Sequence, residues 1–286
     1  MGILGMRRLL AQAILPYARL RTWAQPGLRI LMYHRVATLP HYDQLTVSPA
    51  RFARQMERLA CEYRVVSLAD GLRAIGQGQL RRPLVAVTFD DGYRDNLTEA
   101  LPILRRHAVP ATIFVTTRFC EQAESHPRYG PSPERLHLDW DEVAVLAATP
   151  GITIGSHTLH HPYLPTLPEA QAREEIAQSR TIIESRIGQP VAFFCYPSGD
   201  LGPRELRLVH ESGYAAAVSV APGVNYGWTD PLKLRRTEIT DRDDDEAFTL
   251  KMAGAFDPIH RLLHAKRMWN FARGFGRPSA QTSTRP

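Results

Sequence analysis

The chain has 286 residues, of which 44% are hydrophobic and 22% are charged, and a formal net charge of +6. This composition is typical of a folded globular protein and excludes a collagen-like, coiled-coil or mainly disordered chain. No run of about 18 apolar residues without charges is present, so a transmembrane helix is not expected. The positive charge comes mostly from arginine and is compatible with nucleic acid, anionic lipid or an acidic substrate.

Residues 1–27 form a basic segment with an early arginine pair and a short apolar run. Three interpretations remain open: a signal peptide, an amphipathic helix on a membrane surface, and a helix packed on its own domain. Pro16 and Arg19 interrupt the apolar run, and no small-residue cleavage site follows cleanly. The three cysteines form no CxxC pair, which favours a reducing compartment. We therefore expect a cytoplasmic protein, peripheral to the membrane through this segment, with secretion as the alternative.

Strand-like and helix-like segments alternate between residues 28 and 240. The expected strands are 29–36, 84–89, 110–115, 152–157, 191–197, 215–220 and 233–239. The expected helices are 49–62, 96–107, 140–148, 168–187 and 203–212. Continuous apolar strands between helices indicate a parallel sheet that is covered on both faces or closed into a barrel. We therefore predict a single α/β domain over 28–240, followed by a helical extension and a frayed tail over 241–286.

The strongest motif is TFDDG at 88–92, at the end of an apolar strand. Two adjacent carboxylates at such a position cannot both be buried without a cation or a proton between them. Consecutive side chains on an extended chain point to opposite sides, so Asp90 and Asp91 are expected to have different roles. One could bind a metal while the other accepts a proton. A solvated Asp-Gly turn is the alternative.

A second motif, GSHTLHHP at 155–162, also follows a strand. His157 and His161 are four residues apart, so one helical turn would place both imidazoles on one side. Two histidines and one carboxylate, with open positions for water and substrate, form a catalytic zinc arrangement. His160 would point elsewhere.

The two motifs together resemble the polysaccharide deacetylases, the NodB-homology domain of carbohydrate esterase family 4, over roughly residues 28 to 240. The resemblance implies a distorted (β/α) barrel with one divalent metal, usually Zn²⁺, held by Asp91, His157 and His161. It also implies that Asp90 is the general base that takes a proton from the attacking water.

The third motif of the family usually reads RPPYG, and CYPSG at 195–199 stands in its place. Cys195 replaces the arginine that orients the base, and Ser198 replaces the tyrosine whose backbone N–H binds the oxyanion. Because a backbone donor survives a change of side chain, Ser198 inherits that role. Arg235 or Arg236 could replace the missing arginine, with a structural ion pair as the alternative use.

The family also requires a general-acid histidine, and no late strand with the pattern LxH is evident. The segment LMYHRV at 31–36 instead resembles the opening strand of the exopolysaccharide deacetylase branch, in which the equivalent histidine comes first in the chain. We therefore assign the acid to His34. A histidine that caps a buried strand is the alternative.

These assignments predict a metal-dependent hydrolase that removes acetyl groups from N-acetylated sugars of a polysaccharide or its lipid-linked precursor. Tyr93, Tyr196 and Pro197 are expected to contact the carbohydrate. A member of the same fold that binds carbohydrate but has lost turnover is the alternative. Nucleic acid is not an expected partner, because no binding motif is present and the arginines are scattered.

Overall fold

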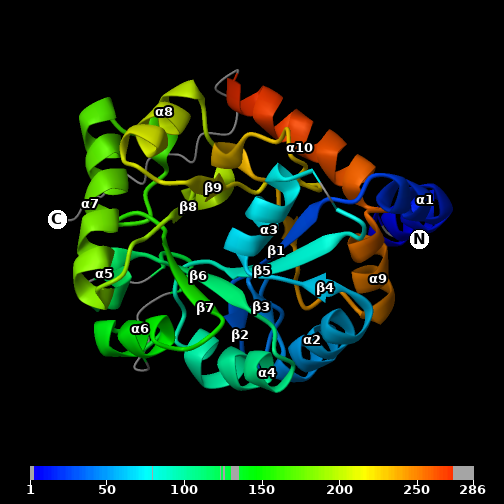
Figure 1. Cartoon of the computed structure of the whole chain (residues 1–286), viewed down its shortest axis with the longest axis horizontal. Helices are drawn as coiled ribbons and strands as arrows, with labels where there is room; N and C mark the ends of the chain where they lie inside the picture. The colour runs from blue at the N-terminus through cyan, green and yellow to red at the C-terminus, as the bar shows by residue number, and fades with distance from the viewer. Residues whose placement is uncertain (1–2, 79, 123, 125, 130–134, 273–286) are drawn as a thin grey trace.

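The computed structural model describes residues 3–78, 80–122, 124, 126–129 and 135–272. Within this part of the chain, an eight-stranded sheet has the order β10-β1-β5-β6-β7-β8-β9, with β4 paired to β5, and all its strand pairs are parallel. Its strands are β1 Leu28–Tyr33, β4 Arg64–Val65, β5 Leu84–Phe89, β6 Ala111–Val115, β7 Ile152–Ser156, β8 Phe193–Cys195, β9 Ala216–Val218 and β10 Thr237–Glu238. The short strands β2 Arg35–Val36 and β3 Thr46–Val47 pair separately. The sheet curls into a half-barrel, which confirms the predicted single α/β domain (Figure 1).

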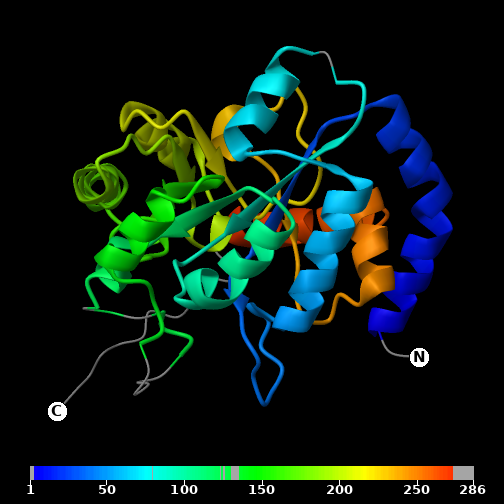
Figure 2. The same cartoon turned by 60° about the horizontal axis from the view of Figure 1, so that its bottom comes forward.

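Helices surround this sheet, most of them on its outer side (Figures 1 and 2). They are α1 Ile3–Ala24, α2 Pro49–Glu62, α3 Leu68–Gly76, α4 Leu101–Arg106, α5 Thr117–Cys120, α6 Trp140–Ala147, α7 Glu169–Ile187, α8 Pro203–Glu211, α9 Asp245–Ala253 and α10 Asp257–Ala272. A π-helical turn over Asn96–Ala100 leads into α4, and Pro102 lies in the first turn of α4.

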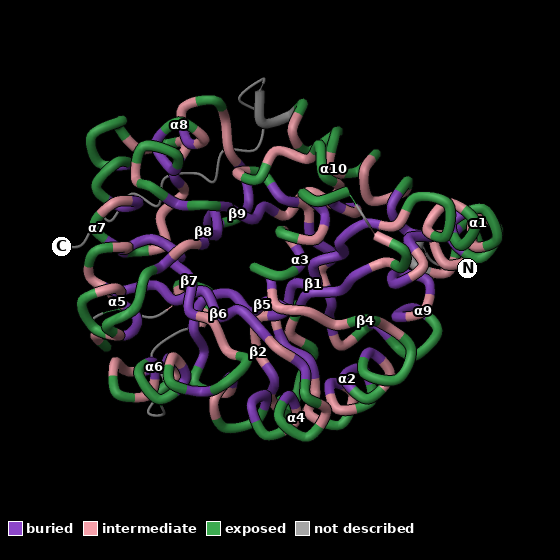
Figure 3. The backbone as a smooth tube through the Cα atoms, viewed as in Figure 1, coloured by how far each residue is buried: buried purple, intermediate pink, exposed green. Residues whose placement is uncertain are grey.

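Alternating side chains of the strands divide the apolar core into two layers. Leu28, Ile30, Leu84 and Ala86 belong to one cluster together with residues of α3, whereas the residues between them pack beneath the outer helices. Figure 3 shows that β1, β5, β6, β8 and β9 are buried along their whole length. Because side chains alternate along β5, the residue at 90 continues on the same side as Ala86. This places its carboxylate at the mouth of the inner layer.

The last three strands are shorter than predicted. The sequence predicts strands over 191–197, 215–220 and 233–239, but pairing is confined to β8, β9 and β10. Prolines at both ends of the β8 segment remove backbone donors, and after β9 the chain leaves the sheet and returns only at β10. An isolated bridge between Val218 and Leu234 is the pairing found at this gap among the described residues. The first predicted strand, 29–36, is divided at His34 into β1 and β2.

The two terminal segments pack against each other. Ala11 and Ala18 of α1 are buried in a small apolar cluster with Leu250, Ala255 and Phe256 from the C-terminal segment. The predicted helical extension contains α9 and α10, and the predicted frayed tail at 273–286 lies outside the described residues. Among the described residues, no helix combines the length and apolar character that crossing a membrane requires.

Candidate active site

Asp91 lies at the carboxyl end of β5, in a sharp turn. Its φ is 68° and that of Gly92 is 62°, so two successive residues adopt the left-handed conformation. A Cβ atom at position 92 would lie 3.1 Å from the Val115 side chain of the neighbouring strand. Glycine therefore serves both the turn and the close approach of β6.

The side chain of Asp91 faces two imidazoles. Its Oδ1 atom is 3.3 Å from Nε2 of His157 and 3.4 Å from Nε2 of His161. The same Oδ1 is buried and has no hydrogen-bond partner among the described residues. Burial lowers the pKa of His161 to about 3, so this imidazole is neutral at pH 7, as a metal ligand must be. An orphaned carboxylate oxygen between two nitrogen donors fits a divalent cation.

The two histidines converge by a different route from the predicted helical turn. Strand β7 ends at Ser156, and the chain from His157 to Pro162 has no helical residue. Thr158 and His161 adopt positive φ values of 70° and 57°. The centroids of the two imidazole rings are nevertheless only 4.8 Å apart. The expectation of a helix was therefore wrong, and a tightly turned loop brings the two rings together.

A backbone contact fixes the orientation of His157. Its Nδ1 atom lies 2.7 Å from the carbonyl oxygen of Cys195, at the end of β8. An Nδ1–H that donates to this carbonyl leaves the Nε2 lone pair directed at Asp91. Cys195 of the third motif thus orients His157 of the second motif.

Asp90 forms a buried ion pair with Arg236. The Arg236 Nη1 and Nη2 atoms donate to the two carboxylate oxygens at 2.6 and 2.7 Å. Arg236 is 1% exposed and also donates to the carbonyl of Ser219 and the hydroxyl of Thr88. Burial alone would raise the pKa of Asp90, but the charge and hydrogen bonds of Arg236 outweigh it and lower the pKa. Asp90 is therefore ionised at neutral pH.

These contacts distinguish the two carboxylates. Both oxygens of Asp90 are occupied by Arg236, whereas Oδ1 of Asp91 faces only the imidazoles. The arrangement favours Asp91 as the metal ligand and Asp90 as the proton acceptor. Atoms of Asp90, His157 and Cys195 also lie within 4.8 Å of one another, but the Arg236 bonds make that set the poorer cation site.

His34 lies beside Asp90, in the break between β1 and β2. Its Nε2 atom is 3.9 Å from Oδ2 of Asp90. The backbone there is held by Asn96, whose amide donates to the His34 carbonyl at 2.8 Å. The ion pair of Arg35 with Asp95 at 2.9 Å holds the next residue in place. A histidine near the start of the catalytic segment thus approaches the carboxylate at the end of β5, which is held by an arginine that precedes β10.

Comparisons with known proteins identify the family. The sequence profile of the polysaccharide deacetylases matches residues 77–217. The Bacillus subtilis protein YxkH, whose name provisionally assigns it to these deacetylases, is 28% identical over 208 residues, which cover 72% of this chain and 69% of that protein. Residues 77–217 belong to the polysaccharide deacetylase family.

A second curated relative and two solved structures agree with this assignment. The B. subtilis peptidoglycan-N-acetylmuramic acid deacetylase PdaA is 30% identical over 111 residues, 38% of this chain and 36% of PdaA. Among solved structures, the Streptococcus pyogenes deacetylase PplD superposes with a TM-score of 0.70 at 23% identity, over 80% of this chain and 99% of PplD. IcaB from Ammonifex degensii superposes with a TM-score of 0.67 at 23% identity, over 79% of this chain and 97% of IcaB. These superpositions support the deacetylase fold.

The expected carbohydrate contacts require a correction. The rings of Tyr93 and Tyr196 are 0% and 1% exposed, and Pro197 is also buried. Tyr93 stacks on His137 with ring centroids 4.7 Å apart, and the Tyr196 hydroxyl donates to the carbonyl of Leu232. Neither ring has a face free to stack on a sugar. Ser198, in contrast, is exposed in a tight turn with φ at 58°.

His126 is a further candidate ligand that no sequence motif predicted. It lies in the irregular segment after α5, and its Nε2 is 3.9 Å from Oδ2 of Asp91. The ligand atoms of Asp91, His126 and His161 all lie within 4.8 Å of one another. His137 Nε2 accepts the His126 backbone N–H at 3.1 Å, and His137 Nδ1 lies 3.1 Å from the Asp91 carbonyl. His126 and His137 both lie in the segment between α5 and α6, but their spacing matches no metal-binding motif.

Proposed function

We propose that this polysaccharide deacetylase is a metal-dependent hydrolase that removes acetyl groups from N-acetylated sugars. The observation that carries the proposal is the unpartnered Oδ1 of Asp91, which faces two imidazole nitrogens beside an ionised Asp90. A divalent cation held by Asp91, His157 and His161, most often Zn²⁺ at such ligands, supplies Lewis acidity: it polarises a carbonyl and lowers the pKa of water.

The remaining residues would move protons around the scissile amide. Asp90 accepts a proton from the attacking water, and its bidentate contact with Arg236 holds it in one orientation. The Ser198 N–H donates to the acetyl oxygen as negative charge develops there. His34 donates a proton to the sugar nitrogen as the C–N bond breaks. The products are acetate and a free amine.

The substrate class follows from relatives and from the groups at the site. PdaA acts on N-acetylmuramic acid in peptidoglycan, and a Bacillus cereus relative with 28% identity is named as a peptidoglycan-N-acetylglucosamine deacetylase. We therefore propose an N-acetylhexosamine unit of a polysaccharide or of its lipid-linked precursor as the substrate. Retention of the base, the acid and all three metal-binding side chains argues against a protein that only binds carbohydrate.

The test is a calorimetric titration of metal-stripped protein with Zn²⁺. We expect one tight site in the wild type and none in His157→Ala. His160→Ala is the matched control, because His160 lies in the same loop but contacts Glu175 at 2.6 Å. The zinc-loaded wild type should then release acetate from acetylated chitooligosaccharides. Absence of a tight site in the wild type, or its survival in His157→Ala, would contradict the proposal.

We further propose that α1 places the protein at a membrane surface. Six large apolar side chains on this helix are at least half exposed, while Ala11 and Ala18 face the domain. The exposed apolar residues are Met6, Leu9, Leu10, Tyr17, Leu20 and Trp23. At 100° per residue they fall on one side of the helix, and Arg7, Arg19 and Arg21 flank it. This pattern suits the interface of an anionic bilayer.

Sedimentation with vesicles tests this location. We expect the wild type to bind vesicles of phosphatidylglycerol more strongly than vesicles of phosphatidylcholine, and the double variant Leu9→Glu/Leu20→Glu to bind neither. A variant with the same charge change on the exposed side of another helix, Leu262→Glu/Leu263→Glu, is the control. Equal binding by both double variants would contradict the proposal.

A further inference from the structure

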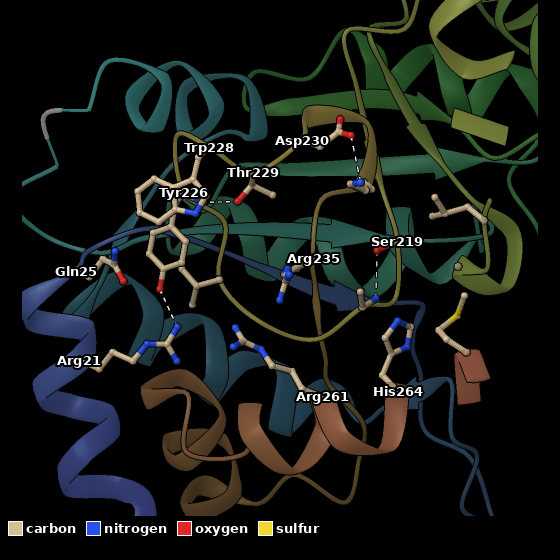
Figure 4. Close-up of a pocket in the computed structure, with 16 residues that line it drawn as sticks. Arg21, Gln25, Ser219, Tyr226, Trp228, Thr229, Asp230, Arg235, Arg261 and His264 are labelled. Carbon is tan, nitrogen blue, oxygen red and sulfur yellow. Dashed lines mark hydrogen bonds and ion pairs between the residues drawn. The ribbon is translucent and has the colours of Figure 1, made fainter. Parts of the chain in front are cut away.

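A large cavity lies in the gap between β9 and β10, next to the candidate active site on the side of Gly199 and Ser219. It has a volume of about 710 Å³ and lies between the end of α1, the segment from Ser219 to Arg235, and α10. Its lining shares no residue with the proposed metal and proton-transfer site. Figure 4 shows that Arg21, Arg235 and Arg261 come from these three segments and are directed into the same space.

The cavity concentrates positive charge that the fold does not neutralise. Arg21, Lys233, Arg235 and Arg261 line it, and Asp230 is the acidic residue among its lining. Asp230 is already engaged, because it accepts the Leu232 N–H at 2.9 Å and lies 3.5 Å from Lys233. Within the part of the chain that the structure describes, no ion pair to Arg21, Arg235 or Arg261 is found. Three half-buried guanidinium groups therefore lack a carboxylate.

Two of these arginines are held close together. A Cβ atom at Gly223 would lie 2.7 Å from Nη2 of Arg261 and 3.2 Å from Cδ of Arg235, so both side chains pass over the same glycine. The Nε atom of Arg261 is buried without a hydrogen-bond partner among the described residues. Burial, followed by the charge of Arg235, lowers the pKa of Arg261. A bound anion would relieve both the repulsion and the missing hydrogen bond.

An aromatic surface adjoins these cations. Tyr226 and Trp228 stack with ring centroids 4.8 Å apart and an interplanar angle of 12°, and Trp228 is 72% exposed. Arg21 lies 3.2 Å from the Tyr226 hydroxyl, which connects the aromatic pair to the cationic wall. An exposed, fixed indole beside an anion site suits a ligand that has a flat face as well as a charged group.

We propose that this cavity is a binding site for a phosphoryl or diphosphoryl group attached to a sugar. The guanidinium groups of Arg235 and Arg261 bind the phosphoryl oxygens, since planar guanidinium donors match phosphate geometry. The sugar ring lies against Trp228. This site goes beyond the proposed deacetylase activity and does not depend on it, because binding needs neither the metal nor Asp90.

Calorimetric titration of the metal-stripped chain tests the proposal, since removal of metal prevents phosphate from binding at the other site. The probes are pyrophosphate and N-acetylglucosamine 1-phosphate at fixed ionic strength. We expect both to bind the wild type, and the double variant Arg235→Gln/Arg261→Gln to bind each at least tenfold more weakly. Trp228→Leu should weaken only the sugar phosphate. Arg82→Gln, which removes an exposed arginine elsewhere, should bind both normally.

A third arm distinguishes the source of the phosphoryl group. Vesicles that contain a polyisoprenyl phosphate are compared with the two soluble probes, using the same variants. Capture of these vesicles that is lost in the arginine double variant supports a lipid-linked source, and binding of the soluble probes alone supports a free sugar phosphate. Absence of binding in all three arms, or equal binding by wild type and double variant, would overturn the proposal. Circular dichroism of each variant checks that it is folded.

Discussion

Arg236 is the residue on which the orientation of Asp90 depends. Its guanidinium is almost fully buried and occupies both carboxylate oxygens, and a lysine has no comparable pair of fixed donors. The resemblance to the deacetylases implies an arginine that orients the base at position 195 of the third motif, and this position is cysteine here. The Nη2 atom of Arg236 lies 3.2 Å from the Cys195 sulfur. An arginine from elsewhere in the chain thus reaches the side chain that replaced the usual one.

This geometry predicts the behaviour of Arg236→Lys. Because the carboxylate would keep a positive neighbour but lose its bidentate contact, we expect kcat to fall by about 10–100-fold while KM and zinc affinity change little. The measurement is steady-state acetate release together with zinc calorimetry. A matched control is Arg29→Lys, since Arg29 forms a similar buried pair with Asp257 at 3.0 Å away from the site. An equal loss of kcat in both variants would show that Arg236 acts only through stability.

At the residue scale, the sequence predicted the site residues that belong to short motifs. Asp90, Asp91, His157 and His161 belong to two short motifs at strand ends, so their proximity followed from parallel topology alone. The choice between Arg235 and Arg236 did not follow from topology. It depends on which of two consecutive side chains faces inward where the chain rejoins the sheet. Tyr93 was expected to contact the sugar because an aromatic ring near the motif can stack on a sugar. Its burial against His137 depends on the segment after α5, which no pattern in the sequence predicted.

The segment between α5 and α6 brings two histidines to the site that the sequence did not predict. It carries His126 to Asp91, and His137 links this histidine to the Asp91 backbone through both ring nitrogens. Burial lowers the pKa of His137 to about 4, so its ring stays neutral and can accept at Nε2 while it donates at Nδ1. Irregular segments have no periodicity, so neither contact could be read from the sequence.

We expect His126→Ala to weaken zinc binding by about tenfold, whereas His157→Ala abolishes it. The reason is position: His126 approaches the outer oxygen of Asp91 at 3.9 Å, while His157 approaches the unpartnered inner oxygen at 3.3 Å. Calorimetry of the metal-stripped variants measures both affinities. Wild-type affinity in His126→Ala would remove this residue from the site.

Helix α10 supplies a pH-dependent contribution to stability. Burial, and then the charge of Lys251, lower the pKa of His260, which stacks on Phe256 at 5.4 Å. The unfolded chain binds a proton at this position below about pH 6.5, but the folded chain resists it. The stabilisation is therefore fully present above about pH 6.5 and is lost as the pH falls.

Urea unfolding of the metal-free protein at pH 7.5, 6.5 and 5.5 checks this expectation. The free energy of unfolding should fall less steeply with decreasing pH in His260→Phe than in the wild type, because the variant keeps the ring stacking and loses the proton-binding group. Other buried histidines contribute to both slopes, so the difference between the two proteins is the informative quantity. Identical slopes would contradict the assignment to His260.

For the whole molecule, continuous apolar strands between helices were enough to predict a parallel sheet, while the choice of a distorted barrel over a sheet covered on both faces came from the resemblance to the deacetylases. The sequence could not show that the barrel stays open between β9 and β10. Segments 215–220 and 233–239 resemble strands in sequence, yet only Ala216–Val218 and Thr237–Glu238 form strands. Ser219, Lys233 and Arg235 line the cavity instead. Whether these segments pair depends on the path of the chain between β9 and β10, which tertiary packing determines.

The central claim is that the two adjacent carboxylates divide metal binding and proton transfer between them. The most direct test compares the wild type with Asp90→Asn at equal zinc content, with acetate release from acetylated chitooligosaccharides as the readout. We predict that Asp90→Asn binds one zinc ion per chain with nearly wild-type affinity and releases no acetate. Loss of zinc together with activity, or acetate release at the wild-type rate, would contradict that division.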